Sequence, residues 1–484
     1  MPIFSLNGSY GIGTLGEDAK IFIDFLSRAG CNMWQILPLG PTGYGNSPYQ
    51  CFSAFAGNSY FLDPKWFLSK GWIDSNLTRN FVQPNTGRVD YGNLYKNRKM
   101  LFGEIFSGFK KFANTNQKKE FEVFKEKNKY WLEDYSCFLA IKEHFGGAAR
   151  KDFPKYKTKS EDAVLFVEQN LTERKEFFSF LEYAFNEQWQ EVKIYAEKKG
   201  ISIVGDLPLY VSDDSADIWT NGHLFQLDEE GNPAFVAGVP PDAFSSTGQL
   251  WGNPLYRWDE HKKDGFSWWK LRIFRQAELF HVIRIDHFIG ISSYYSIPYG
   301  AKNAVNGRWE KGPGKELTNL FLEVSDEVKF IAEDLGMVTN EVRRLIKSTG
   351  FPGMKLMQFA FDGSNNPNLL HNIPKNSVVY TGTHDNQTTV GFFNSCDKNL
   401  RKNARKYMNV KRNAELPAAL IRECLKSRAN TVIIPLYDYL HFDDSARINT
   451  PSTLGENWGW RVSSPLDNIL ADEIRALAHI YKRL

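Results

Sequence analysis

The sequence has few cysteines, little net charge and no long apolar run, and each shortage excludes a class of protein. Five cysteines in 484 residues, none spaced as CxxC, give no disulfide framework and no zinc or redox motif. The 59 basic and 56 acidic residues nearly cancel to +3, which favours neither nucleic acid nor an anionic membrane as a partner. No apolar run reaches the roughly 18 residues of a membrane span. The N-terminal MPIFSLNGSYGIG lacks the pattern of a secretion signal, so we expect a cytoplasmic globular protein.

Several catalytic motifs are also missing. The sequence contains no HExxH, no GxxxxGK(S/T) and no GxSxG, which leaves zinc hydrolysis, P-loop phosphoryl transfer and α/β-hydrolase chemistry without support. Nothing in it indicates an oligomeric state. Aromatic residues, by contrast, make up 15% of the chain. Most of them suit a core, but Trp and Tyr also stack well on sugar rings.

The pattern of apolar runs predicts a closed parallel barrel. Eight short runs separated by helical stretches are the candidate strands: residues 31–37, 60–62, 201–207, 281–286, 328–333, 354–361, 378–383 and 430–437. Runs that are apolar on both faces are typical of a parallel sheet covered on both sides, and eight such units predict a (β/α)8 TIM barrel. An open doubly wound sheet is the alternative. It is disfavoured because no GxGxxG follows the first run.

The barrel accounts for the whole chain, 1–484, as one unit with insertions. Residues 65–200 are rich in Lys and helical in period, so we expect a mainly helical insertion whose charges form a solvated face. We also expect a small hairpin over 225–239. Two long loops, 42–60 and 238–254, are rich in Gly, Pro, Ser or Tyr and are expected to lie at the carboxyl-terminal face of the barrel without regular structure.

Acidic residues end several of these runs, where the reactive groups of a barrel gather. The residues are Asp206, Arg284 with Asp286, Glu333, and His384 with Asp385. Side chains alternate along a strand, so Arg284 and Asp286 share a face, and we expect the guanidinium to lower the pKa of Asp286 and keep it ionised. Glu333, on the next strand, is then the candidate protonated partner. A carboxylate after a strand also fits a helix cap or an ion pair, but the joint pattern favours catalysis.

Two such carboxyl groups suit glycoside chemistry. Separations of about 5–5.5 Å define the retaining mechanism and about 6.5–9.5 Å the inverting one. Neighbouring strands lie about 4.8 Å apart, which favours the retaining mechanism.

Read together, the motifs resemble the 4-α-glucanotransferases, or amylomaltases, of glycoside hydrolase family 77. The resemblance covers about 450 residues through GIGTLGEDA, LPLGPTGYGNSPYQCFSAFAGN, GISIVGDLPLYVSDDSADIW, GVPPDAFSSTGQLWGNPLY, VIRIDHFIG, FIAEDLG, GFPGMKLMQFAFD, YTGTHDNQT and ARINTPSTLGENWGWR. It implies that Asp286 is the nucleophile, Glu333 the general acid/base and Asp385 a third carboxylate that binds sugar hydroxyls. It also implies substrate contacts from Ser47, Tyr49, Asp206, Trp251, Arg284 and His384. The implied substrates are α-1,4-glucans, and no cofactor or metal is required.

The sequence departs from the pattern of this family at two places, and two other functions stay open as alternatives. The family more often has Gln-Asp where this chain has Tyr437-Asp438, and Trp where it has Phe153. One alternative is an α-1,4-glucan hydrolase of the α-amylase type, although no C-terminal β-sandwich of that type is visible. The other is a glucan-binding protein on an inactive barrel, which would have no need of both Asp286 and Glu333.

Overall fold

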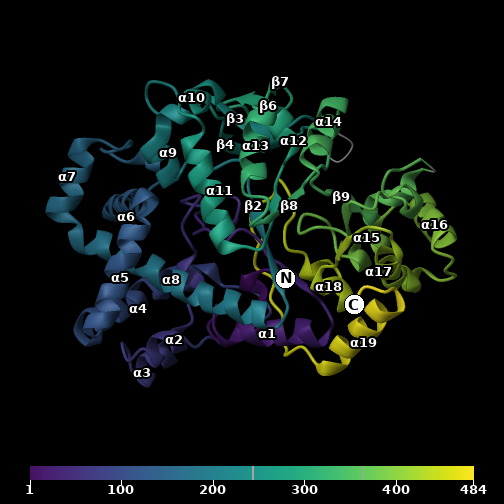
Figure 1. The fold of residues 1–484 in the computed structure, drawn as a ribbon, viewed down its shortest axis with the longest axis horizontal. Helices are drawn as coiled ribbons and strands as arrows, with labels where there is room; N and C mark the ends of the chain where they lie inside the picture. Colours follow the sequence, from purple (N-terminus) through teal and green to yellow (C-terminus); the bar gives the residue numbers. More distant parts are fainter. Residues whose placement is uncertain (242–244, 364) are drawn as a thin grey trace.

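A seven-stranded parallel sheet forms the centre of the molecule (Figure 1). The computed structural model describes residues 1–241, 245–363 and 365–484. The strand order is β1-β2-β5-β8-β9-β10-β11. The strands are β1 Met33–Gln35, β2 Ser202–Leu207, β5 Val282–Ile285, β8 Lys329–Ala332, β9 Gly353–Leu356, β10 Ser377–Tyr380 and β11 Thr431–Ile433. Seven of the eight predicted runs are therefore strands of one sheet.

The sheet curls until its two edge strands face each other. Residues of both β1 and β11 line one cavity of about 270 Å³, together with Arg284 and His384 from the barrel interior and with residues of helices outside it, such as Phe22 and Ile474. The Tyr380 hydroxyl, on β10, reaches across this interior and donates a hydrogen bond to Gln35 Oε1 on β1 at 2.9 Å. The sheet is thus nearly a closed barrel.

The predicted strand at 60–62 is wrong. Ser59–Phe61 is instead a 3-10 helix, η2, whose N-terminal Asn58 side chain accepts a hydrogen bond from the Tyr60 N–H. Asp63 then caps the next helix by accepting from the Lys65 N–H. Polar caps on both sides of a three-residue apolar run favour turns over a strand.

In two other runs, the strand ends before the predicted apolar run does. The run 430–437 pairs only over β11, because Pro435 lacks an N–H and directly precedes helix α18, Leu436–Tyr439. The run 354–361 leaves the sheet after Leu356 and continues as the 3-10 helix η5, Met357–Asp362. Apolar periodicity alone does not separate a short buried strand from a buried helical turn.

Helices fill the chain between β1 and β2 and form the blue lobe of Figure 1. They are α2 Pro64–Ser69, α3 Ser75–Asn80, α4 Tyr91–Phe112, α5 Thr115–Lys127, α6 Lys129–His144, α7 Glu161–Asn170 and α8 Thr172–Lys198. The longest, α8, packs on β2 and so ties the lobe to the barrel. The lobe also buries charged side chains, among them Arg98, Arg150 and Glu182, so its charges are not all solvated as predicted.

A second, four-stranded antiparallel sheet has the order β4-β3-β6-β7. Its strands are β3 Phe235–Val239, β4 Gln249–Pro254, β6 Ser293–Pro298 and β7 Arg308–Lys311. Of the hairpin predicted over 225–239, only residues 226–234 fold back on themselves, through an antiparallel bridge between Leu227 and Pro233 and backbone hydrogen bonds from the Ala234 N–H to Gln226 O and from the Asp228 N–H to Asn232 O. Strand β3 pairs with β4 and β6 instead. The segment 238–254, expected to be irregular, contains part of β3 and all of β4; its residues 242–244 lie outside the described residues.

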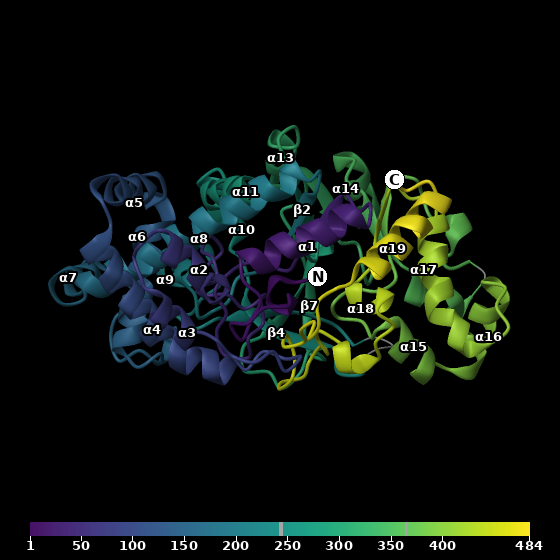
Figure 2. The same cartoon turned by 90° about the horizontal axis from the view of Figure 1, so that it is seen from below.

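The remaining helices surround the barrel, and both views show α1 beside α19 (Figures 1 and 2). They are α1 Glu17–Arg28, α9 Ala216–Asn221, α10 Trp258–Lys263, α11 Ser267–Leu279, α12 Ile289–Ser292, α13 Lys315–Glu323, α14 Asn340–Thr349, α15 Thr389–Ser395, α16 Lys398–Tyr407, α17 Leu416–Lys426 and α19 Asn468–Ile480. Short 3-10 helices are η1 Ile3–Ser5, η3 Arg150–Asp152, η4 Gly222–Leu224, η6 Leu370–Asn372, η7 Asn413–Glu415 and η8 Asp444–Ala446. Within the described residues, none of the helices has both the length and the apolar character to cross a bilayer.

Candidate active site

One guanidinium, that of Arg284, holds three carboxylates at the mouth of the barrel. Its Nη1 donates to both carboxylate oxygens of Asp206 at 2.6 Å and to Asp286 Oδ1 at 3.1 Å. Its Nη2 lies 3.5 Å from Glu333 Oε1. The side chains of Arg284 and Asp206 are 3% and 0% exposed, so this ion pair is shielded from water. Charged groups buried in this way need partners as close as these.

Strand register explains how these residues meet. Strand β5 lies between β2 and β8, and Arg284 stands directly opposite Asp206 in the ladder. The ladder continues past the strand ends, because the Asp286 N–H donates to Leu207 O and the Glu333 N–H donates to Ile285 O. Asp286 and Glu333 therefore leave neighbouring strands at nearly the same level. Arg284 and Asp286 lie on the same face, as predicted, and this brings the guanidinium to the carboxylate.

The electrostatics of the carboxylate pair differ from the prediction. Burial raises the pKa of Asp286 well above its ordinary value, and the attraction of Arg284 only partly opposes this, so the expected lowering is wrong. Burial also raises the pKa of Glu333. Two adjacent carboxyl groups in such a site titrate as a unit, so a proton taken up there belongs to the pair and not to one residue. Arg284, in contact with both groups, favours one ionised carboxylate in the pair while the other carries the proton.

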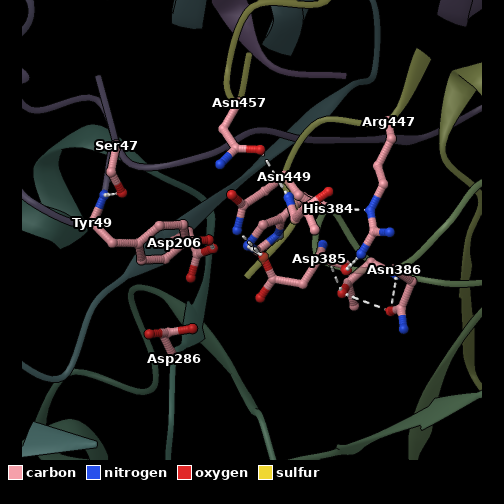
Figure 3. A network of polar contacts seen from close by, with 12 residues as sticks. Ser47, Tyr49, Asp206, Asp286, His384, Asp385, Asn386, Arg447, Asn449 and Asn457 are labelled. Atoms are coloured by element: carbon pink, nitrogen blue, oxygen red, sulfur yellow. Dashed lines mark hydrogen bonds and ion pairs between the residues drawn. The ribbon is translucent and has the colours of Figure 1, made fainter. Parts of the chain in front are cut away.

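Tyr49 and His384 form the opposite wall of the site (Figure 3). The Tyr49 hydroxyl donates to Asp206 Oδ2 at 2.7 Å, and its ring stacks on His384 with centroids 5.2 Å apart. Burial lowers the pKa of His384, which favours the neutral imidazole. Ser47 joins this wall through the backbone, since its Oγ accepts a hydrogen bond from the Tyr49 N–H at 3.3 Å.

Asp385 differs from the other carboxylates because its side chain is 47% exposed. Its Oδ1 accepts a hydrogen bond from Asn449 Nδ2 at 2.6 Å and lies 3.4 Å from His384 Nε2. Its backbone carbonyl accepts from Arg447 Nη2 at 2.7 Å, as Figure 3 shows. Asn449 and Arg447 were missed as site residues. They lie in the motif ARINTPST, which the sequence analysis noted for the resemblance without assigning a role.

Trp251 reaches the site from β4 of the second sheet. Its ring meets that of His287 edge to face, with centroids 4.9 Å apart and planes at 88°. His287 follows Asp286 directly, and its backbone N–H donates a hydrogen bond to Glu333 Oε2. Its φ of +49° is rare for a residue with a side chain and indicates a constrained turn. Sequence reasoning passed over His287, although RIDHF places it beside the nucleophile candidate.

Two buried acids anchor the backbone of the loop that carries Ser47 and Tyr49. Glu182 Oε2, on α8, accepts from the Gly57 N–H at 2.8 Å, and Asp217 Oδ2 accepts from the Ala54 N–H at 2.8 Å. A Cβ on Gly57 would lie 2.1 Å from the Phe185 ring, so only glycine permits this approach to α8. The helical lobe therefore helps to shape one wall of the site.

Comparisons with known proteins agree with this geometry. A family model described as 4-alpha-glucanotransferase, glycoside hydrolase family 77, matches residues 1–467. The chain is 44% identical to a 4-alpha-glucanotransferase of Thermus thermophilus, covering 99% of this chain and 97% of that protein. It is 43% identical to one of Clostridium butyricum over the full length of both.

The solved structure of an amylomaltase from Streptococcus agalactiae, in complex with acarbose, superposes with a TM-score of 0.96 at 37% identity. The match covers 100% of this chain and 98% of that one. This likeness and the nearly closed sheet confirm the predicted (β/α)8 barrel class. The chain belongs to the 4-alpha-glucanotransferase family, glycoside hydrolase family 77.

Proposed function

We propose that the protein transfers segments of α-1,4-glucan from a donor chain to the 4-hydroxyl of an acceptor glucan or glucose, with retention at the anomeric carbon. The observation that carries this is the set of Asp206, Asp286 and Glu333 around the single guanidinium of Arg284. Family membership favours transfer over the hydrolase alternative. An inactive glucan-binding barrel would have no use for a pair of raised-pKa carboxyl groups at one mouth.

In the first step, Asp286 attacks the anomeric carbon of the donor while the bond from that carbon to the leaving glucan breaks. Glu333 gives its proton to the oxygen of the departing chain. A covalent glycosyl–Asp286 intermediate forms, and Glu333 is left ionised. Arg284 contacts both carboxylates and so compensates charge as it moves from one to the other.

In the second step, the acceptor 4-hydroxyl attacks the anomeric carbon and passes its proton to Glu333, and Asp286 leaves. The new bond is again α-1,4, so the reaction is close to energetically neutral and needs no activated donor. Transfer exceeds hydrolysis only if the bound acceptor keeps water from the intermediate. The Trp251 ring, held against His287 beside the carboxylate pair, is the side chain that we assign to the acceptor side.

The remaining roles are assigned to residues that frame the cleavage point. Asp385, with its half-exposed carboxylate, binds sugar hydroxyls and favours a distorted ring. Tyr49, His384 and Ser47 hold the sugar on the opposite wall, and Asp206 holds it from the Arg284 cluster. We assign residues 1–484 to one catalytic unit, in which 65–200 is an insertion, and maltooligosaccharides or dextrins of starch or glycogen as substrates in the cytoplasm.

The test is the product ladder from maltotriose. Transfer predicts glucose together with maltodextrins longer than the substrate, with little growth in total reducing ends. Glu333→Gln abolishes the ladder, whereas Glu327→Gln, the same change at an exposed position just before β8, leaves it intact. Steady growth of reducing ends without longer products would show hydrolysis instead.

A further inference from the structure

The loop that carries His384 and Asp385 is held at both ends by one buried carboxylate. This loop, residues 381–389, joins β10 to α15 and is called the His384 loop below. Asp438 lies on α18 and is 0% exposed. Its Oδ2 accepts a hydrogen bond from Thr381 Oγ1 at 2.6 Å, and its Oδ1 accepts from the Thr389 N–H at 2.8 Å. The two carboxylate oxygens therefore fix the first residue of the loop, Thr381, and the residue at which it passes into α15, Thr389.

Further contacts from the same part of the chain hold the middle of the loop. We call residues 437–449 the brace segment. The Tyr437 hydroxyl donates to Thr383 O at 3.2 Å. Asp444 accepts from Gln387 Nε2 at 2.6 Å and from the Thr388 N–H at 3.1 Å. Arg447 and Asn449 complete the set through their bonds to Asp385.

A glycine in α15 lets the Asp444 carboxylate approach the backbone closely. A Cβ on Gly391, in α15, would lie 2.0 Å from Asp444 Oδ1, so a larger residue there would displace the Asp444 carboxylate from its bonds to the loop. Within the loop, Asn386 Oδ1 accepts hydrogen bonds from the N–H and the hydroxyl of Thr383. The His384 loop is thus held by hydrogen bonds within the loop and by hydrogen bonds from the brace segment along its length.

The need for this support follows from where Asp385 sits. Asp206, Arg284 and Asp286 are placed by the ladder of neighbouring strands, which fixes their relative heights. Asp385 lies beyond the end of β10 and is half exposed, so strand pairing does not fix its position. A shift of about 1 Å in such a group costs up to 10²-fold in rate.

We propose that Asp438 is a positioning residue for the reaction: it sets the His384 loop so that His384 and Asp385 face the sugar held by the Arg284 cluster. The inference rests on the proposed function, since it assigns no new chemistry to the site. In the described part of the chain, the hydrogen bonds of the Asp438 carboxylate go to Thr381 and Thr389, so it acts through the loop that carries His384 and Asp385. A carboxylate accepts from both groups at once, whereas an amide keeps one acceptor oxygen for the Thr389 N–H and turns an N–H₂ group toward Thr381, whose hydroxyl must then change from donor to acceptor.

The first experiment measures kcat and KM for maltotriose disproportionation by Asp438→Asn. We expect kcat to fall roughly 10- to 100-fold with a much smaller change in KM, because Asp385 acts mainly on the distorted ring of the transition state. Asp18→Asn is the matched control. Asp18 also accepts from a threonine hydroxyl and a backbone N–H, those of Thr14, and burial raises its pKa to about 6, as it does for Asp438. We expect its kcat to change less than about threefold.

The second experiment separates positioning from general loss of structure. Asp438→Asn is combined with Asp385→Asn. If Asp438 acts through Asp385, the double variant is barely slower than Asp385→Asn alone, whereas independent effects multiply. Should Asp438→Asn be insoluble, Thr381→Val replaces it in the same cycle, and Thr381→Ser, which keeps the hydroxyl, restores kcat to within a few-fold of wild type.

The outcomes separate this proposal from the proposed function. A wild-type enzyme that forms no longer maltodextrins overturns both. If the wild type transfers normally, any of three results overturns the role of Asp438 and leaves the proposed function standing. These are a retained kcat in the Asp438→Asn or Thr381→Val variant, effects that multiply in the Asp385→Asn background, and a loss of kcat in Asp18→Asn as large as in Asp438→Asn.

Discussion

The barrel mouth and the helical lobe both bury acidic side chains, but they stabilise them differently. At the mouth, Asp206, Asp286 and Glu333 surround the charged Arg284. In the lobe, Glu182 accepts hydrogen bonds from the backbone of Gly57 and the hydroxyl of Tyr135, and burial raises its pKa to about 8. The mouth therefore places a cation among its acids, whereas the lobe keeps an acid neutral and uses it as an anchor.

The comparison predicts that changes at the mouth affect turnover first, while those in the lobe affect stability. The largest effect is expected for Asp286→Asn. Removing the proposed nucleophile lowers transfer from maltotriose on the order of 10⁴- to 10⁶-fold. The fold is retained, because the Asn side chain still fits beside Arg284. Circular dichroism and the product ladder measure both. Turnover near wild type would contradict the assignment, and the exposed Asp326→Asn is the matched control.

Arg284→Met comes next, and it tests whether one cation serves the whole mouth. The change leaves three carboxylates without their common partner, so we expect a loss of about 3–5 kcal/mol in the free energy of unfolding at neutral pH. Lower pH protonates the carboxylates and reduces this loss. Denaturant titrations at two pH values measure it.

Arg284→Lys is the control for charge. It keeps the cation but not the fork geometry, so stability is largely retained while turnover falls roughly 10²-fold or more. A lysine variant as unstable as the methionine variant would show that packing, not charge, is what Arg284 supplies.

These two regions also differ in how far the sequence predicts them. Asp206, Arg284, Asp286 and Glu333 were predicted because strand ends and the two-residue alternation are local patterns, and neighbouring strands convert them into neighbours in space. Glu182 was missed because a glutamate in a lysine-rich helix has the pattern of a solvated face. Its burial depends on a loop about 125 residues earlier in the chain.

The same reasoning explains the other misses. The brace segment contacts the His384 loop across 49 to 64 residues, so no local pattern marks Asp438 or Asn449 as partners of that loop. The false strand at 60–62 arose from a three-residue apolar run whose polar caps decided the outcome. The pKa of Asp286 was predicted in the wrong direction because the sequence shows the Arg284 partner but not the depth of burial.

A smaller effect is expected at the exposed edge of the mouth. Asn449→Ala removes the hydrogen bond to the Asp385 carboxylate, which water can partly replace because that side chain is half exposed. We expect kcat/KM for maltotriose to fall roughly 10-fold with little change in stability. Asn449→Asp, which places a second negative charge against Asp385, should cost more. An alanine variant indistinguishable from wild type would show that Asp385 does not need the hydrogen bond from Asn449.

The smallest effect on turnover is expected in the lobe, from Glu182→Gln. Because burial raises the pKa of Glu182 from 4.5 to about 8, the folded state holds a proton that the unfolded state releases between these values. Stability of the wild type therefore falls as pH rises through this window, and the glutamine variant lacks this contribution. Melting temperatures at pH 5 and pH 8 measure the difference, with Glu168→Gln, an exposed position on α7, as the control. The nearby charge of Arg275 opposes the effect without cancelling it. Equal slopes for wild type and Glu182→Gln would mean that Glu182 is already ionised in the fold, and the contrast between lobe and mouth would then disappear.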